Sequence, residues 1–441
     1  MDESSLSALS WLVTTVLSMA VLPSWTAVSV RIYERLGLSS SLLGPINPLK
    51  IAAPALLIFL YTQRTRISEF LPKGLALFLG VTYLLGSGAV LYGAFQCQWN
   101  LTLFREWFLH GWAALWALSF FFLSNRQRKW VIGAWLTWVG GSCLMDWLAP
   151  AWQDWLFAHI FDPDTRVLDV REVGDVLTGV FGRQTLGKFL AWIPWLWLLT
   201  LKPVAKPSSQ RFRFALGMAA VIFSAGIVLA TSQRGPFVSV LAAALVTIVL
   251  YARNEGFRKR TLLMMIGGFA LSVGVLTVSF VPRPILESRI RSMIGLSSTG
   301  SLGDQAEQNT KFRWGMLSFS TQVILENPMG RACFPNERYF WDRGTTAGHA
   351  HHLFLQEYRA RGWIWGTLHL LMWIFCGWAF FRALPSAQEN FFWFGGFLSI
   401  VFVGQFDYPW MALSQSIVIW VFLWKGFSLW GSLNIRRWSR L

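Results

Sequence analysis

Long apolar runs, each about the length of a membrane-spanning helix, alternate along the chain with polar connections. A bilayer core about 30 Å thick needs about 20 apolar residues per helix. The pattern predicts about 12 transmembrane helices, near residues 8–30, 43–62, 74–95, 106–124, 130–149, 187–201, 214–231, 237–252, 261–281, 362–382, 390–408 and 410–431. We therefore expect an all-α integral membrane protein.

The second and the sixth of these runs contain residues that disfavour a continuous helix. Pro45, Pro48 and Lys50 lie in or beside the second run, and Lys188 and Pro194 interrupt the sixth. Proline lacks the backbone donor of a helix interior and clashes with the preceding turn. We predict that either run can form a broken or re-entrant helix.

Basic residues gather in alternate connections, as the positive-inside rule requires of cytoplasmic loops. The clusters are Arg64, Arg66 and Lys73; Arg126, Arg128 and Lys129; Lys202, Lys206, Arg211 and Arg213; Arg253, Arg258, Lys259 and Arg260; and Arg436, Arg437 and Arg440. This distribution predicts that both termini are cytoplasmic. Arg31 and Arg35, in the first outer loop, are the main exception.

Composition supports a membrane protein and argues against binding to nucleic acid. Hydrophobic residues make up 54% of the chain and charged residues 14%, which is unusual for soluble domains. Lysine and arginine exceed aspartate and glutamate by 38 to 22, giving a net charge of +16. Because these basic residues lie between apolar runs, the positive-inside rule explains them and no nucleic-acid partner is expected.

Two predicted outer segments are too long to be simple connectors. The first lies near residues 152–185 and the second spans 281–361. We predict three parts: helices 1–9 with the first outer loop over residues 1–280, a large helical outer loop over 281–361 that carries the chemistry, and helices 10–12 with a basic tail over 362–441.

The most unusual stretch of the large loop is its histidine cluster. Three of the six histidines, His349, His351 and His352, stand within four positions, just before an amphipathic run that returns to the membrane. A histidine at the start of such a helix titrates near neutral pH and can accept a proton from a hydroxyl. Zinc binding by His349 and His352 is an alternative, although no cysteine or carboxylate at ligand spacing accompanies them. Another is that these histidines form only local hydrogen bonds.

Arg234 lies in a hairpin after a charge-free apolar run, at a position where a cation needs an anionic partner. A guanidinium forms bidentate hydrogen bonds with phosphate. Gly235 permits close approach of the backbone. The alternative is an ordinary interfacial arginine whose charged end reaches water.

Further arginines of the large loop strengthen the first interpretation. Arg313 stands near a predicted helix start, and Arg283, Arg289 and Arg291 precede it in a basic segment. Together with Arg234 and the histidines, they predict an outward-facing pocket for a diphosphate with a base beside it.

Four motifs in order resemble the O-antigen ligase and polymerase superfamily of bacterial envelope assembly. They are Ser-x-Arg-Gly at residues 232–235, Arg-Trp at 313–314, Asn-Pro followed by Gly at 327–330, and His-x-x-x-Leu leading to Gly-x-x-x-Gly at 351–366. The predicted helices and the late outer loop extend the similarity over most of the chain.

The resemblance implies a GT-C-like glycosyltransferase of the bacterial inner membrane, multi-pass, with its active site facing the periplasm. Such enzymes transfer a glycan from undecaprenyl pyrophosphate without a nucleotide sugar, a metal or another cofactor, and here with inversion at the anomeric carbon. The residues that the resemblance implies for pyrophosphate binding are Arg234 and Arg313, with Arg289 and Arg291 nearby in the loop. The implied base is His351, with His349 as second choice, because His352 stands where the family usually shows Asn.

Several functions stay open on this sequence. A ligase transfers the glycan to lipid A-core, whereas a polymerase uses a second lipid-linked glycan as acceptor, and both contact membrane lipids. A metal-dependent lipid-linked glycosyltransferase would use Asp162 and Asp164, which have a spacing that can hold a divalent cation on phosphate. A lipid transporter would need charges inside its helices, and only Asp146, Lys188 and Asp407 were candidates, all near predicted helix ends.

Overall fold

The computed structural model describes the helical body of the protein. The described residues are 3–23, 25–38, 47–96, 101–160, 183–200, 207–231, 233–257, 259–280, 315–330, 352–406 and 413–438. Every regular element within these ranges is a helix, so the all-α prediction is confirmed there. Four described helices are long and apolar enough to cross a membrane, over Lys73–Tyr92, Gln210–Val228, Gly235–Asn254 and Leu353–Ser386. The count of about 12 spans and the positions of the termini and loops stay predictions.

Ten of the twelve apolar runs, the third to the twelfth, correspond to single helices. These are α7 (Lys73–Gln96), α8 (Leu101–Phe122), α9 (Asn125–Leu148), α12 (Arg183–Leu198), α13 (Pro207–Ala230), α14 (Arg234–Asn254), α15 (Lys259–Phe280), α19 (Leu353–Ala383), α20 (Glu389–Val403) and α21 (Leu413–Trp438). Pro194 is accommodated within α12. Between these helices lie α10 (Pro150–His159), a helical segment at residues 315–326 and the short 3-10 helix η2 (Leu384–Ser386).

The first two apolar runs form shorter pieces. The predicted single helix near 8–30 was wrong: α1 (Glu3–Ser18) ends before Pro23, and α2 (Thr26–Arg35) follows. Proline disfavours helical geometry in the preceding residue, which explains the break. The second run is broken, as predicted, into α4 (Pro48–Ile51) and α5 (Ala53–Thr62), after which α6 (Arg64–Phe70) follows.

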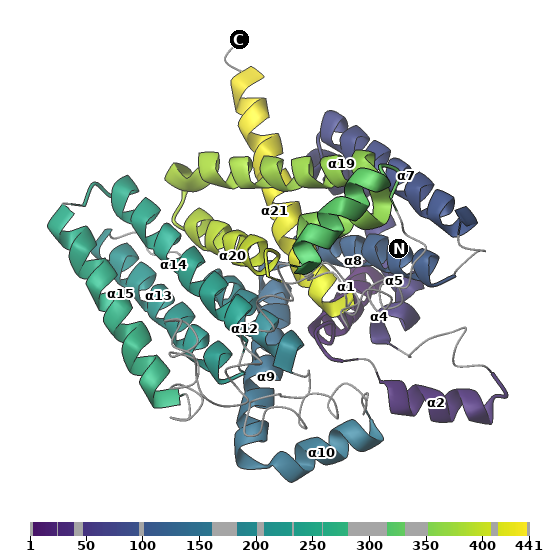
Figure 1. Ribbon diagram of the computed structural model, residues 1–441, viewed down its shortest axis with the longest axis horizontal. Coiled ribbons are helices and arrows are strands. Elements are labelled where there is room, and N and C mark those ends of the chain that lie inside the picture. Colours follow the sequence, from purple (N-terminus) through teal and green to yellow (C-terminus); the bar gives the residue numbers. More distant parts are fainter. Residues whose placement is uncertain are drawn as a thin grey trace.

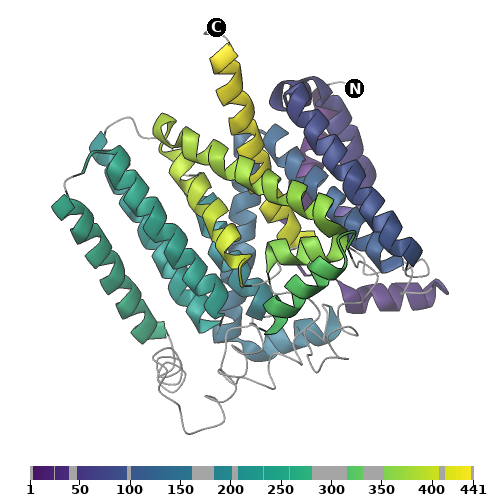
Figure 2. The same ribbon diagram turned by 45° about the horizontal axis from the view of Figure 1, so that its top comes forward.

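The long helices are arranged in two groups around a central set. Figure 2 shows α13, α14 and α15 on one side and α7 on the opposite side, with α20 and α21 between them. Helix α20 packs along α14 and α12, while α21 packs along α8 and α19. The short helices α2 and α10 lie at the edge of the array (Figure 1).

Helix α12 forms the centre of the core, with Trp192 and Trp195 fully buried. Gly395 of α20 packs against the Trp195 ring and Gly396 against the Phe422 ring of α21, since a Cβ at either glycine would overlap that ring. Ser399 of α20 donates a hydrogen bond to the Ala191 carbonyl at 3.0 Å. Small residues and hydroxyl-to-carbonyl bonds are the means by which membrane helices pack closely.

Candidate active site

A three-residue turn, Gly404–Phe406, joins two of the sequence motifs. The Leu353 N–H at the start of α19 donates to the Gly404 carbonyl at 2.6 Å. Phe406, at the end of the same turn, contacts Gly235 at the start of α14: a Cβ added to Gly235 would lie 2.9 Å from the Phe406 Cβ. The starts of α14 and α19, more than 100 residues apart in the chain, therefore meet at this turn. Gly235 was predicted to permit close approach of the backbone, and its described neighbour there is Phe406.

His352 is the N-cap of α19. Its backbone is extended, with φ −152° and ψ 123°, and its Nδ1 accepts a hydrogen bond from the Leu355 N–H at 3.3 Å. Asparagine is among the preferred N-cap residues because its side-chain oxygen makes the same bond. The structure thus gives a physical reason for histidine at a position where the resembling family shows asparagine: the imidazole replaces the asparagine cap.

The capping role predicts a pH-dependent stability. Burial lowers the pKa of His352 below its usual 6.5, and a hydrogen bond with Gln405 acts in the opposite direction. As the pH falls below about 6.5, the unfolded chain binds this proton before the folded protein does. The contribution of His352 to the free energy of unfolding is therefore fully present above that pH and is lost as the pH falls.

We expect thermal unfolding in detergent micelles to show a lower midpoint at pH 5.5 than at pH 7.5. His352→Asn keeps an N-cap acceptor but removes the titrating group, so it should reduce this difference. An equal pH dependence in the variant and the parent protein would contradict the assignment.

The backbones of two glycines from separate motifs, Gly330 and Gly362, pack against each other. Gly330 and Gly362 have φ values of 86° and 81°, in the left-handed region that favours glycine. Gly362 interrupts α19, so that residues 353–361 and 363–383 form two helical halves joined by a kink. The Trp363 N–H after the kink donates to the Pro328 carbonyl at 2.8 Å. This contact fixes the kink against the turn that ends the 315–326 helix.

Gly362→Ala is expected to disrupt this kink. A Cβ there would lie 2.7 Å from the carbonyl oxygens of Pro328 and Met329, and the positive φ adds about 1–3 kcal/mol of strain. We expect at least a tenfold loss of activity together with a lower unfolding temperature. Gly140→Ala in α9 is the matched control, since a Cβ there meets nothing within 4 Å. Equal behaviour of the two variants would show that the kink is dispensable.

A buried ion pair lies in the first half of α19, just before the kink, and a hydrogen bond from Trp365 links the second half to it. Glu357 and Arg361 are only 1% and 8% exposed and form a salt bridge. Trp365, beyond the kink, donates from Nε1 to Glu357 Oε2 at 2.6 Å. The Arg361 guanidinium carbon lies 5.1 Å from the ring centroid of Trp107 on α8. Removing one member of a buried pair costs about 3–5 kcal/mol, because the remaining charge is left buried and unpaired.

This ion pair was missed from the sequence. Glu357 and Arg361 fall in the amphipathic run after the histidines, and charges inside helices were considered only for the lipid-transporter alternative. The contact between them could have been predicted from spacing. Glu357, Arg361 and Trp365 stand at i, i+4 and i+8, which places them along one face of a helix.

The ion pair lines a cavity of about 370 Å³ between α7, α8, α19 and α21. His110 of α8 and His369 of α19 line the same cavity, together with aromatic side chains from all four helices. His369 Nε2 accepts a hydrogen bond from Trp373 Nε1 at 2.9 Å. The volume falls within the range of about 300–1,000 Å³ that is typical of small-molecule sites.

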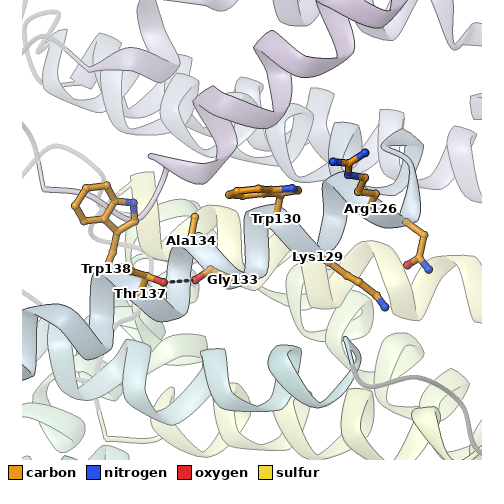
Figure 3. Close-up of a pocket in the computed structure, with 8 residues that line it drawn as sticks. Arg126, Lys129, Trp130, Gly133, Ala134, Thr137 and Trp138 are labelled. Carbon is orange, nitrogen blue, oxygen red and sulfur yellow. Dashed lines mark hydrogen bonds between the residues drawn. The ribbon is translucent and has the colours of Figure 1, made fainter.

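A second, more open groove of about 750 Å³ runs along α9 (Figure 3). Arg126, Lys129, Trp130 and Trp138 line it, and Thr137 Oγ1 donates to a carbonyl of the same helix, that of Gly133. The described lining contains neither a carboxylate nor an imidazole that could act as a base. Basic and tryptophan side chains are typical of a helix surface at the membrane interface, so this groove is not the candidate active site.

Of the residues predicted to carry the chemistry, Arg234 is the first residue of α14, and only its backbone is described. Five others lie outside the described residues: His349, His351, Arg289, Arg291 and Arg313. The alternative metal ligands Asp162 and Asp164 also lie outside them. Within the described ranges, no three His, Cys, Asp or Glu side chains gather as metal ligands would.

These features define a class: a multi-pass helical membrane protein in which two helix starts meet at one turn, one of them the histidine-capped start of a kinked helix. Residues 219–371 match the family model described as O-antigen ligase. The matched range contains all four sequence motifs, and it confirms the similarity to the O-antigen ligase and polymerase superfamily over this part of the chain. No individual curated protein matches the chain.

Proposed function

We propose that the protein is an O-antigen ligase that transfers a glycan from undecaprenyl pyrophosphate to lipid A-core on the periplasmic side of the inner membrane. The family match over residues 219–371 supports this class of reaction. The observation that carries the proposal is the meeting of two helix starts at the Gly404–Phe406 turn. Arg234 begins one of these helices, and the histidine cluster directly precedes the other.

The electrostatics of this arrangement suit an anionic leaving group. The N-terminus of a helix carries a partial positive charge and exposed N–H donors, which favour phosphate. We assign Arg234, Arg313, Arg289 and Arg291 to the pyrophosphate. Their guanidinium groups would offset the charge that develops on the bridging oxygen as its bond to the anomeric carbon breaks.

A base must remove the proton from the acceptor hydroxyl. We assign this role to His351, with His349 as the second choice, because His352 Nδ1 caps α19. The acceptor oxygen forms its bond to the anomeric carbon on the face opposite the leaving pyrophosphate, which inverts the configuration. The proton passes to the imidazole, and the electron pair of the broken bond leaves with the pyrophosphate. No step of the proposed reaction uses a metal.

The proposal is tested by measuring the glycan attached to the lipopolysaccharide of a strain that lacks this protein. Complete loss of attached glycan, restored by expression of the full chain, is the result expected of a ligase. A core that carries a single repeat unit would instead identify a polymerase of the same superfamily. Transfer by the purified protein that is lost in EDTA and regained with Mg²⁺ or Mn²⁺ would support the metal-dependent alternative and overturn the proposed mechanism.

A further inference from the structure

The groove along α9 is cationic at one end and largely apolar along the rest of its length. It begins at Arg126 and Lys129 and continues over Trp130, Gly133 and Trp138. Figure 3 shows the two cationic side chains toward one end of this row and Trp138 at the other. Trp138 is nine residues beyond Lys129, which corresponds to about 13–14 Å along the helix axis at 1.5 Å per residue. That length is close to the depth of one leaflet, about half of a 30 Å bilayer core.

The cationic end has no acidic residue beside it. The first turn of α9 contains none, and the described side chains that line the groove include no carboxylate. Arg126 and Lys129 stand near the N-terminus of α9, where the helix macrodipole is positive and favours an anion. The Arg126 guanidinium carbon lies 6.0 Å from the ring centroid of Trp11, so α1 flanks this end. An anion bound here would be stabilised by two side-chain charges and by the dipole.

The polar atoms of the apolar part are bonded within the protein. Thr137 Oγ1 donates to the Gly133 carbonyl at 2.9 Å, and Trp138 Nε1 donates to the Ser18 carbonyl of α1 at 3.1 Å. Trp130 and Trp138 are 58% and 40% exposed. Gly133 lies between them along the row, and a Cβ added there would meet no heavy atom within 4 Å. This part of the groove is therefore open and offers apolar surface, as an acyl chain requires.

A cationic end that leads into an apolar groove is complementary to a lipid with a phosphate headgroup. The positive-inside rule accounts for basic residues in a cytoplasmic loop, but it does not require an open groove that runs from them along the helix. Basic sites between membrane helices on the cytoplasmic side bind anionic headgroups. An arginine and a lysine both form charge-assisted hydrogen bonds with phosphate.

We propose that the α9 groove binds one anionic phospholipid from the leaflet on the side of the basic clusters, which the sequence predicts to be cytoplasmic. Its phosphate lies at Arg126 and Lys129, and one acyl chain lies along Trp130, Gly133 and Trp138. A free phosphate would use only the cationic end, whereas a zwitterionic lipid would use the apolar part without the preference that the two cations provide.

Lipid binding can be measured without glycan transfer, by native mass spectrometry of the full-length protein in detergent. The protein is titrated with dioleoyl phosphatidylglycerol or with dioleoyl phosphatidylcholine, which has the same chains and a zwitterionic headgroup. We expect the first phosphatidylglycerol to bind at least tenfold more tightly than phosphatidylcholine. The double variant Arg126→Gln with Lys129→Gln should lose this preference. Gly133→Leu fills the open space and should weaken phosphatidylglycerol binding at least threefold.

The matched control is Arg253→Gln with Arg260→Gln, which removes the same charge from exposed residues of another basic cluster and should keep the preference. The proposed lipid site is overturned if both lipids bind the parent protein equally, or if the control loses the preference as fully as the groove variant. It is also overturned if Gly133→Leu binds phosphatidylglycerol as the parent does, or if inorganic phosphate at the same concentration displaces the lipid. Unfolding temperatures in detergent without added lipid should be equal in all variants, which excludes misfolding as the cause.

Discussion

His351→Ala is expected to abolish glycan transfer while leaving membrane insertion and folding intact. General base catalysis contributes roughly 10²–10⁴-fold to a rate, so the remaining activity should fall by at least two orders of magnitude. His351 directly precedes the N-cap of α19, and its replacement leaves both partners of the described capping bond, His352 Nδ1 and the Leu355 N–H, in place. Transfer of labelled glycan from undecaprenyl pyrophosphate to lipid A-core is the measurement, with the unfolding temperature taken in parallel.

Variants of the two neighbouring histidines are the matched controls. His352→Asn should retain most activity, because asparagine can cap α19 in place of the imidazole. His349→Ala should have a smaller effect than His351→Ala. If His349→Ala is inactive and His351→Ala is fully active, the base has been assigned to the wrong histidine.

The order of apolar and polar residues was sufficient to predict most of the helices. Each of the ten runs from the third to the twelfth forms a single helix. An apolar segment of this length satisfies its backbone hydrogen bonds in a membrane by forming a helix. The prediction of a single helix for the first run was wrong. The apolar pattern continues past Pro23, but proline restricts the backbone there and the helix is broken.

The contacts between motifs could not be predicted in the same way. The sequence marked Gly330 and Gly362 as motif residues, but it gave no indication that their backbones pack against each other. The turn at Gly404–Phe406 belongs to none of the four motifs, although it contacts residues of two of them, Gly235 and Leu353. Such contacts depend on how helices far apart in the chain pack, which a pattern read along one chain does not contain.

The buried ion pair was missed for a related reason. Charge and hydrophobicity along α19 do not reveal that Trp107 of α8 covers Arg361. An amphipathic interpretation places Glu357 and Arg361 on a solvated face, whereas both side chains are buried in the structure.

Arg234→Lys is expected to impair transfer severely, although it keeps the positive charge. A lysine ammonium is a point charge and cannot reproduce the two parallel hydrogen bonds that a guanidinium forms with phosphate. Loss of one donor to a developing anion costs about 10²–10³-fold in rate in known enzymes, so we expect Arg234→Lys to lose at least tenfold and Arg234→Ala more.

The matched control is Arg253→Lys, which makes the same substitution at the opposite end of α14. Arg253 is exposed and belongs to a basic cluster that the sequence predicts to be cytoplasmic, so transfer should be unchanged. The unfolding temperatures of both variants should equal that of the parent, because neither substitution alters the packing of Gly235 on Phe406. Normal transfer by Arg234→Lys would assign Arg234 a structural role at the start of α14, and the pyrophosphate would then have to be held by the arginines of the large loop.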